Sequence, residues 1–155
     1  MLVRLLYVSR ALDPESGSAT QSILDSARKY NAANGITGIL CYGGGLYLQA
    51  VEGGRTQVNE LYGYIVRDKR HQDVVLLDYQ EITERRFGGW TMGQVNLAKL
   101  NTSIVLKYSE KPELDPYSVS GAVSLALLEE LMLTASIIGR AEEAARLNVL
   151  NNQVK

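Results

Sequence analysis

The sequence has few of the residues on which metal and thiol chemistry depends. Its 155 residues include one cysteine, one histidine and one phenylalanine. A single cysteine excludes an internal disulfide and a metal site built from several thiolates. Because His71 is the only histidine, a site with two or more histidine ligands is excluded as well. Cys41 lies in the apolar run 39–42, so we expect a buried and unreactive thiol.

The sequence also lacks an excess of charge and a long apolar run. The formal net charge is −1, which gives no indication of a surface for nucleic acid or for an acidic membrane. The most apolar stretch, 122–138, is shorter than the roughly 20 residues that cross a bilayer, and Glu129 and Glu130 lie in its middle. Met1 leads into an apolar strand pattern without signal-peptide features. We therefore expect a cytoplasmic protein that binds neither nucleic acid nor membranes.

The apolar pattern predicts alternating strands and helices over the first 97 residues. Helices are expected at about 18–34 and 56–68, and strands at 2–9, 36–42, 46–52, 74–79 and 90–97. Asn34-Gly35 is typical of a left-handed helix cap, and the triplet 43–45 of a hairpin turn. This order predicts an α+β, ferredoxin-like βαββαββ fold, in which a five-stranded mixed sheet carries both helices on one face.

The character of the sequence changes after residue 97. We predict one domain over 1–97 and a helical extension over 98–155, whose elements are a short helix at 100–108, a linker at 111–116 and helices at 120–138 and about 140–150. The 120–138 helix is apolar on most sides. It is therefore expected either to cover the open face of the sheet or to join subunits, and we favour the second role and a homo-oligomer.

Three polar residues occupy positions where the pattern predicts core residues. Tyr7 and Gln49 each share a strand face with aliphatic neighbours, and Asn31 lies on the apolar side of the first helix. Each of them alone has an ordinary explanation as a buried polar group that the backbone satisfies. Together they predict a polar cluster between the helices and the sheet, which suits a ligand with a flat apolar body and a polar edge.

Six blocks of the sequence, in order and at matching spacing, resemble the BLUF family of blue-light sensors that use flavin. The blocks are Leu6–Ser9, Asn31, Asn34–Leu40, Leu48–Gly53, Arg67–His71 and Arg86–Met92. The resemblance implies a photoreceptor that binds FAD non-covalently and is not an enzyme. It also implies a signal that passes through the C-terminal helices to an unknown downstream protein. The preference for FAD over FMN rests on the resemblance alone.

The resemblance further implies roles for individual residues. Tyr7 would donate an electron and a proton in the photochemistry, and Gln49 would bridge Tyr7 and the flavin. Asn31 would pair with the pyrimidine edge, and Arg70 is the best candidate for a phosphate. The full set of expected flavin-binding residues is Tyr7, Ile23, Asn31, Gln49, Ile65, Asp68, Arg70 and His71, with Ile23 and Ile65 on the two sides of the ring.

Trp90 and Met92 correspond to a signal-relay pair on the fifth strand. The two positions have the same strand parity, so both could face the pocket, and which of them faces the flavin is left open.

Two other functions fit the same topology. An acylphosphatase-like hydrolase would need an arginine-bearing phosphate loop after the first strand, and the segment 9–13 lacks the glycine-rich chemistry of such a loop. The second alternative is a regulatory module of ferredoxin-like fold that binds a colourless metabolite. Colour distinguishes these functions, because only the flavoprotein would be yellow.

Overall fold

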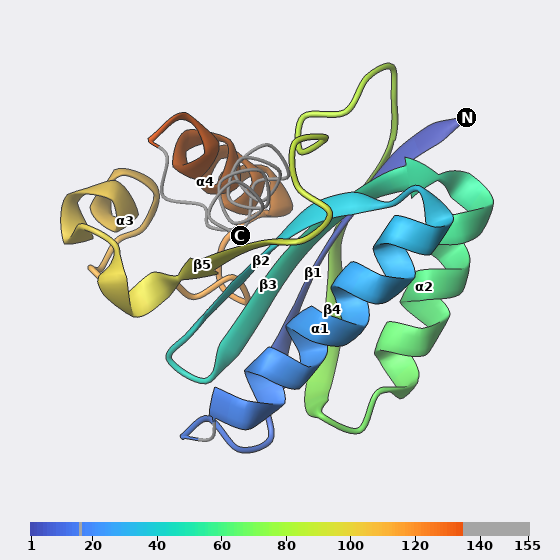
Figure 1. The fold of residues 1–155 in the computed structure, drawn as a ribbon. Helices are drawn as coiled ribbons and strands as arrows, with labels where there is room; N and C mark the ends of the chain where they lie inside the picture. The colour runs from blue at the N-terminus through green and yellow to red at the C-terminus, as the bar shows by residue number, and fades with distance from the viewer. Residues whose placement is uncertain (16, 135–155) are drawn as a thin grey trace, which may run out of the picture.

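The computed structural model describes residues 1–15 and 17–134, which form a sheet with helices on both faces (Figure 1). In chain order the elements are β1 (Leu2–Ala11), α1 (Gly17–Asn34), β2 (Thr37–Gly43), β3 (Leu46–Gly54), α2 (Arg55–Arg67), β4 (His71–Ile82), β5 (Gly93–Asn96), the 3-10 helix η1 (Leu97–Lys99), α3 (Thr102–Tyr108) and α4 (Gly121–Leu133). None of the helices among these residues is long and apolar enough to cross a membrane.

The sheet has five strands in the order β4-β1-β3-β2-β5. Strand β1 pairs antiparallel with β3 and β4, β2 pairs antiparallel with β3, and β5 lies parallel to β2. Helices α1 and α2 cover one face (Figure 1). The predicted ferredoxin-like fold is confirmed, and the fifth strand extends the sheet at the edge formed by β2.

Glycines end the elements where the sequence predicts. Gly35 follows α1 with a φ of 64°, a left-handed conformation that costs least without a Cβ atom. Gly43, Gly44 and Gly45 all have positive φ values and close the β2–β3 hairpin.

The last two strands differ from their predicted extents. Strand β4 is longer than the predicted 74–79, because its pairing with β1 continues from His71 to Ile82. Strand β5 is shorter than the predicted 90–97, because its pairing with β2 begins only at Gly93. Residues 83–92 form an irregular segment, which buried side chains hold in place as described below.

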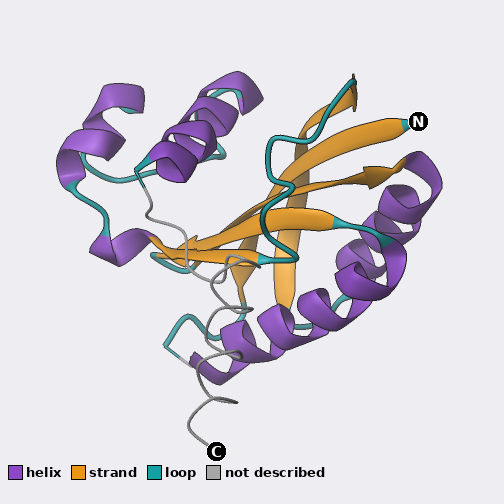
Figure 2. Cartoon of the chain, turned by 45° about the horizontal axis from the view of Figure 1, so that its top comes forward, coloured by secondary structure: helices purple, strands orange, loops and turns teal. Residues whose placement is uncertain are grey.

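Helices lie on both sides of the sheet (Figure 2), and the sheet separates two apolar cores. Alternation along β1 directs Leu5 and Tyr7 toward α1 and α2, and Leu6 and Val8 toward α4. Cys41 lies in the α4-side core, and burial raises the pKa of its thiol, as expected for an unreactive cysteine.

Helix α4 covers the face of the sheet opposite α1 and α2. Its buried leucines, Leu127, Leu128 and Leu131, pack in one cluster with residues of β1, β2 and β3 of the same chain. This is the first of the two placements that the sequence left open, and the expected role in joining subunits stays a prediction. The end of the predicted helix 120–138 and the predicted helix at about 140–150 lie outside the described residues.

Replacing Leu128 with alanine should lower the free energy of unfolding by about 2–5 kcal/mol, because this fully buried side chain would leave a cavity under α4. Leu133→Ala is the matched control, since this leucine of the same helix is 82% exposed and its loss should change stability by at most about 0.5 kcal/mol. Chemical denaturation measures both. Equal effects would contradict the packing of α4 on the sheet.

Candidate functional site

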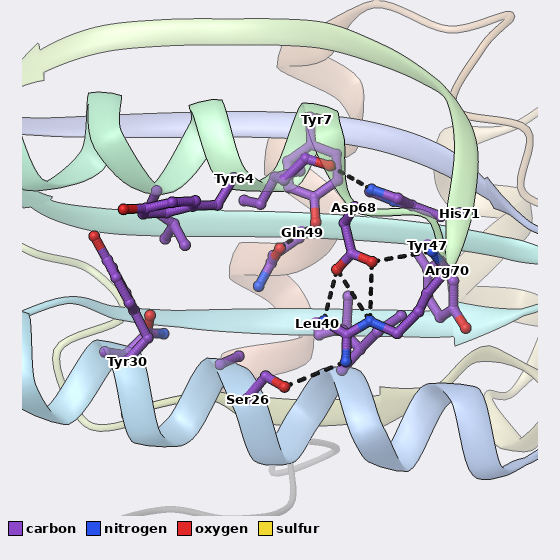
Figure 3. Close-up of a pocket in the computed structure, with 15 residues that line it drawn as sticks. Tyr7, Ser26, Tyr30, Leu40, Tyr47, Gln49, Tyr64, Asp68, Arg70 and His71 are labelled. Carbon is purple, nitrogen blue, oxygen red and sulfur yellow. Dashed lines mark hydrogen bonds and ion pairs between the residues drawn. The ribbon is translucent and has the colours of Figure 1, made fainter.

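A cavity of about 210 Å³ lies between the sheet and the helices α1 and α2 (Figure 3). Its walls are mostly apolar, and a few polar groups point into it, as is typical of ligand sites. The eight residues that the sequence predicted as flavin-binding all line this one cavity: Tyr7, Ile23, Asn31, Gln49, Ile65, Asp68, Arg70 and His71. The fold therefore brings together side chains from β1, α1, β3, α2 and the segment that enters β4.

A chain of buried hydrogen bonds runs along the floor of the cavity. Tyr7 and Gln49 are direct partners in the β1–β3 ladder, and the Tyr7 hydroxyl donates to Gln49 Oε1 (Figure 3). Gln49 Nε2 in turn donates to Met92 Sδ at 3.4 Å. The Gln49 amide thus has its acceptor end on a phenol and its donor end on a thioether.

Burial keeps the Tyr7 phenol protonated. Loss of solvation raises its pKa far above the usual value of about 10, and the negative charge of Asp68 raises it further. A neutral phenol is a hydrogen-bond donor, which matches the amide oxygen that it faces.

Asn31 contributes an acceptor that has no partner among the described residues. Its side chain is fully buried at the cavity wall, and Nδ2 donates to the backbone oxygen of Thr91 at 2.8 Å. The other end of the amide, Oδ1, is buried and accepts no hydrogen bond from the residues that the structure describes. Such a group costs about 1–3 kcal/mol, which a ligand with an N–H donor would recover.

Polar side chains close the end of the cavity where α2 meets β4. Arg70 forms an ion pair with Asp68 at 2.6 Å and donates to Ser26 of α1 (Figure 3). It also donates to Ser22 of the same helix. Partial burial disfavours the charged form of Asp68, but the hydrogen bonds from Arg70 outweigh this effect and lower the pKa of the carboxyl group.

The single histidine is held in one tautomer at the same end of the cavity. His71 Nε2 lies 2.6 Å from the Ile65 carbonyl oxygen, which can only accept, so this nitrogen carries a proton. The other ring nitrogen, Nδ1, lies 2.7 Å from Ser9 Oγ. His71 thus links β4 to both α2 and β1.

The predicted relay pair is divided between the two faces of the sheet. Met92 packs in the core beside α1 and α2 and contacts Gln49, whereas Trp90 packs in the α4-side core. The argument from strand parity was wrong, because residues 90–92 precede β5 and do not alternate as a strand. Of the two side chains, Met92 is the one on the cavity side.

The sequence did not identify about half of the residues that line the cavity. They are Ser26, Ala27, Tyr30, Leu40, Tyr47, Leu61 and Tyr64. The residues of α1 follow Ile23 at helical spacing, and Tyr47 precedes Gln49 by two positions, so periodicity places them on the correct faces. That these faces enclose a cavity follows only from the packing of both helices on the sheet.

Comparison with known proteins identifies the family. The family described as "Sensors of blue-light using FAD" matches residues 2–93. The chain belongs to the BLUF family. Members of this family are flavin-using blue-light sensors, and the matched segment contains every residue that lines the cavity.

Curated relatives contain a BLUF region within longer chains. The chain is 41% identical to the photoactivated adenylate cyclase subunit alpha of Euglena gracilis over 87 residues, which are 56% of this chain and 8% of the relative. It is 34% identical to the blue light- and temperature-regulated antirepressor BluF of Escherichia coli over 88 residues, which are 57% of this chain and 22% of that protein. The chain therefore spans less than a quarter of these two proteins.

Solved BLUF structures of similar length share the fold. BlsA in its photo-activated state is 31% identical with a TM-score of 0.75, and the match covers 84% of this chain and 94% of that one. BlrB in the dark state is 33% identical with a TM-score of 0.71, and the match covers 86% and 96% of the two chains.

The buried phenol should make stability depend on pH in the alkaline range. Folding raises the pKa of Tyr7, so the folded protein keeps a proton that the unfolded chain loses near pH 10, and the stabilisation is lost as pH rises. The difference in unfolding free energy between the wild type and Tyr7→Phe should therefore shrink by about 1 kcal/mol between about pH 9 and pH 11. Denaturant titrations at several pH values measure it, and a constant difference would contradict the burial of a protonated Tyr7.

Proposed function

We propose that this chain is a blue-light photoreceptor that holds FAD non-covalently in the cavity between α1 and α2. The observation that carries the proposal is that Asn31 Oδ1 has no partner among the described residues, and that Asn31 lines the same cavity as the Tyr7–Gln49 pair. The use of a flavin follows from membership of the BLUF family. The binding of FAD and the roles of the individual residues are our inference.

The residues of the cavity fit a flavin ring. Ile23 on α1 and Ile65 on α2 offer apolar side chains to a flat ring, and Asn31 Oδ1 would accept from its imide N–H. At about 210 Å³ the cavity is smaller than the roughly 300–1,000 Å³ of sites that enclose a whole drug-sized ligand. We infer that it encloses the ring alone and that the phosphate-bearing tail leaves past Arg70.

The choice between FAD and FMN depends on the part of the cofactor outside the ring. The family description names FAD. A structure of BlrP1 from Klebsiella pneumoniae, 32% identical with a TM-score of 0.62 over 69% of this chain and 29% of that one, contains FMN. Because the ring is common to both cofactors, the cavity itself accommodates either, and our proposal of FAD follows the family description.

The response to light would start from the hydrogen bonds of Gln49. Bound flavin would supply absorption of blue light and a ring that accepts an electron. The Tyr7 phenol can give an electron and the proton that it shares with Gln49 Oε1 to the bound ring, and both would return to Tyr7 within the same cycle. If the Gln49 amide then exchanges its ends, Tyr7 loses its acceptor and Met92 Sδ loses its donor, without any net charge being created.

The loss of the hydrogen bond between Gln49 and Met92 would transmit the rearrangement of Gln49 to residues outside the cavity. Met92 lies next to β5, and the preceding turn contacts α4 through an ion pair between Arg86 and Glu129. We propose that the rearrangement of Gln49 alters this segment and then the C-terminal helices, where a partner protein or a second subunit would respond. The chain's own activity would then be signalling and not catalysis.

The hydrolase alternative finds no support at the end of β1. Arg10, the arginine that such an enzyme would direct toward a phosphate, lies 3.7 Å from Asp73 and stacks on the ring of Tyr117 at 4.4 Å. Its guanidinium therefore already pairs with a carboxylate and an aromatic ring of the same chain.

The purified protein should be yellow, with an oxidised-flavin spectrum that shifts slightly to the red under blue light and recovers in darkness. Extraction followed by chromatography against FAD and FMN standards identifies the cofactor, and we expect FAD. A colourless protein that takes up neither flavin would contradict the proposal, and it is the result that a metabolite-binding module would give.

Tyr7→Phe and Gln49→Leu should each retain flavin and lose the normal red shift. Phenylalanine keeps the ring and removes the hydroxyl, and leucine keeps the bulk and removes the amide with its two exchangeable ends. Ser26→Ala is a control at the cavity wall, because it removes one bond to Arg70 and leaves the Tyr7–Gln49 pair intact. Absorption difference spectra measure all three, and a normal shift in Tyr7→Phe would remove Tyr7 from its assigned role.

A further inference from the structure

Glu52 is a fully buried carboxylate on the face of the sheet away from the cavity. Its Oε2 accepts from Arg4 Nε at 2.9 Å and forms an ion pair with Arg4 Nη2 at 2.8 Å. The same carboxylate accepts the backbone N–H of Arg86 at 3.0 Å and that of Phe87. Both oxygens are thus used, and two of the donors belong to the irregular segment between β4 and β5.

This segment carries Met92 to the cavity, and it is fixed at both ends. Glu52 holds residues 86 and 87 at its start. At its end, the Gly38 N–H donates to the Trp90 carbonyl at 2.9 Å, and Asn31 Nδ2 donates to the Thr91 carbonyl. We name residues 86–92 the anchored turn. Its path is set by groups from α1, β2 and β3.

The anchored turn also contacts the helix on the far side of the sheet. The Arg86 side chain pairs with Glu129 of α4. Phe87 and Trp90 are buried in one cluster with the leucines of α4. Glu52 therefore holds the part of the chain that lies between the Gln49–Met92 contact and α4.

We infer that Glu52 is a positioning residue for the light response, and that it acts by holding the anchored turn so that Met92 stays against Gln49. This inference rests on the proposed function. Without the carboxylate, the N–H groups of Arg86 and Phe87 would have to find other acceptors, and the turn would leave its present path. Met92 would then cease to accept from Nε2 of Gln49, so the dark arrangement of the amide would lose one of its two hydrogen bonds and the return to it would slow.

Removing Glu52 alone would leave the buried Arg4 without its partner and could unfold the protein. The test therefore compares two double variants, both of which lack the ion pair. One combines Arg4→Met with Glu52→Gln, and the other combines Arg4→Met with Glu52→Leu. Glutamine keeps an oxygen that can accept from the turn, and leucine of similar size does not. The two proteins differ in that acceptor and in the amide NH2 group that accompanies it.

The dark recovery of the flavin spectrum is the first measurement. We expect recovery in the glutamine variant to lie within about two-fold of the wild type, and recovery in the leucine variant to be about five-fold slower or more. Equal recovery rates in the two variants would overturn the inference. A failure of the proposed function is distinct, because the unaltered protein would then show no red shift at all.

The fluorescence of the single tryptophan is the second measurement, and it needs no photochemistry. Trp90 is 5% exposed and lies in the anchored turn, so release of the turn should shift its emission to longer wavelength in the leucine variant only. A general loss of stability would not shift the emission under conditions where the protein stays folded, which circular dichroism checks. The same emission maximum in both variants would contradict the inference.

Amide exchange of the unaltered chain decides the question if neither variant folds. The backbone N–H groups of Arg86 and Phe87 donate to a buried carboxylate, so in darkness they should exchange at least about a hundred-fold more slowly than in an unstructured chain. Exchange at the unstructured rate would show that Glu52 does not hold the turn.

Discussion

The cavity depends on the register in which β1 pairs with β3. In this register Tyr7 lies directly opposite Gln49, and both side chains project toward α1 and α2. A slip of one residue would send one of them through the sheet to the α4 side and would separate phenol and amide completely. The register is secured by nine paired positions and by alternation along β1, which gives each face of the sheet its own apolar core.

The cavity side of the sheet combines apolar walls with polar groups that the protein satisfies only in part. Tyr7 donates to Gln49, and Gln49 donates to Met92, so both ends of the Gln49 amide are satisfied. The amide of Asn31, in contrast, uses only its donor end among the described residues. A buried acceptor without a donor is costly, and a fold that retains one is prepared for a ligand. The same two amides that line the cavity also hold residues 91 and 92, so a change at the cavity would act on this piece of backbone.

The opposite face of the sheet carries a second apolar core, in which α4 and the anchored turn pack together. Helix α4 contributes three fully buried leucines to the core on that side, and the anchored turn contributes Phe87 and Trp90. Met92 and Trp90 are two residues apart and lie on different sides of the sheet. In the proposed response, a displacement that begins at Gln49 would therefore reach the α4 side through a short piece of backbone, without passing through the strands.

The sequence by itself determined the element order, the helix cap at Gly35, the hairpin at Gly43–Gly45 and the faces on which Tyr7, Asn31 and Gln49 lie. These features follow from local periodicity and from backbone preferences of single residues, which the chain expresses without distant partners. The motifs around them were sufficient to indicate the family. Only the tertiary structure decided where Met92 and Trp90 point, that Glu52 holds the turn before them, and that α4 packs on its own sheet. The reason is that hydrogen bonds accepted by Glu52 and donated by Gly38 and Asn31 outweigh the local strand pattern at residues 90–92, and these partners lie about 35 to 60 positions away in the chain.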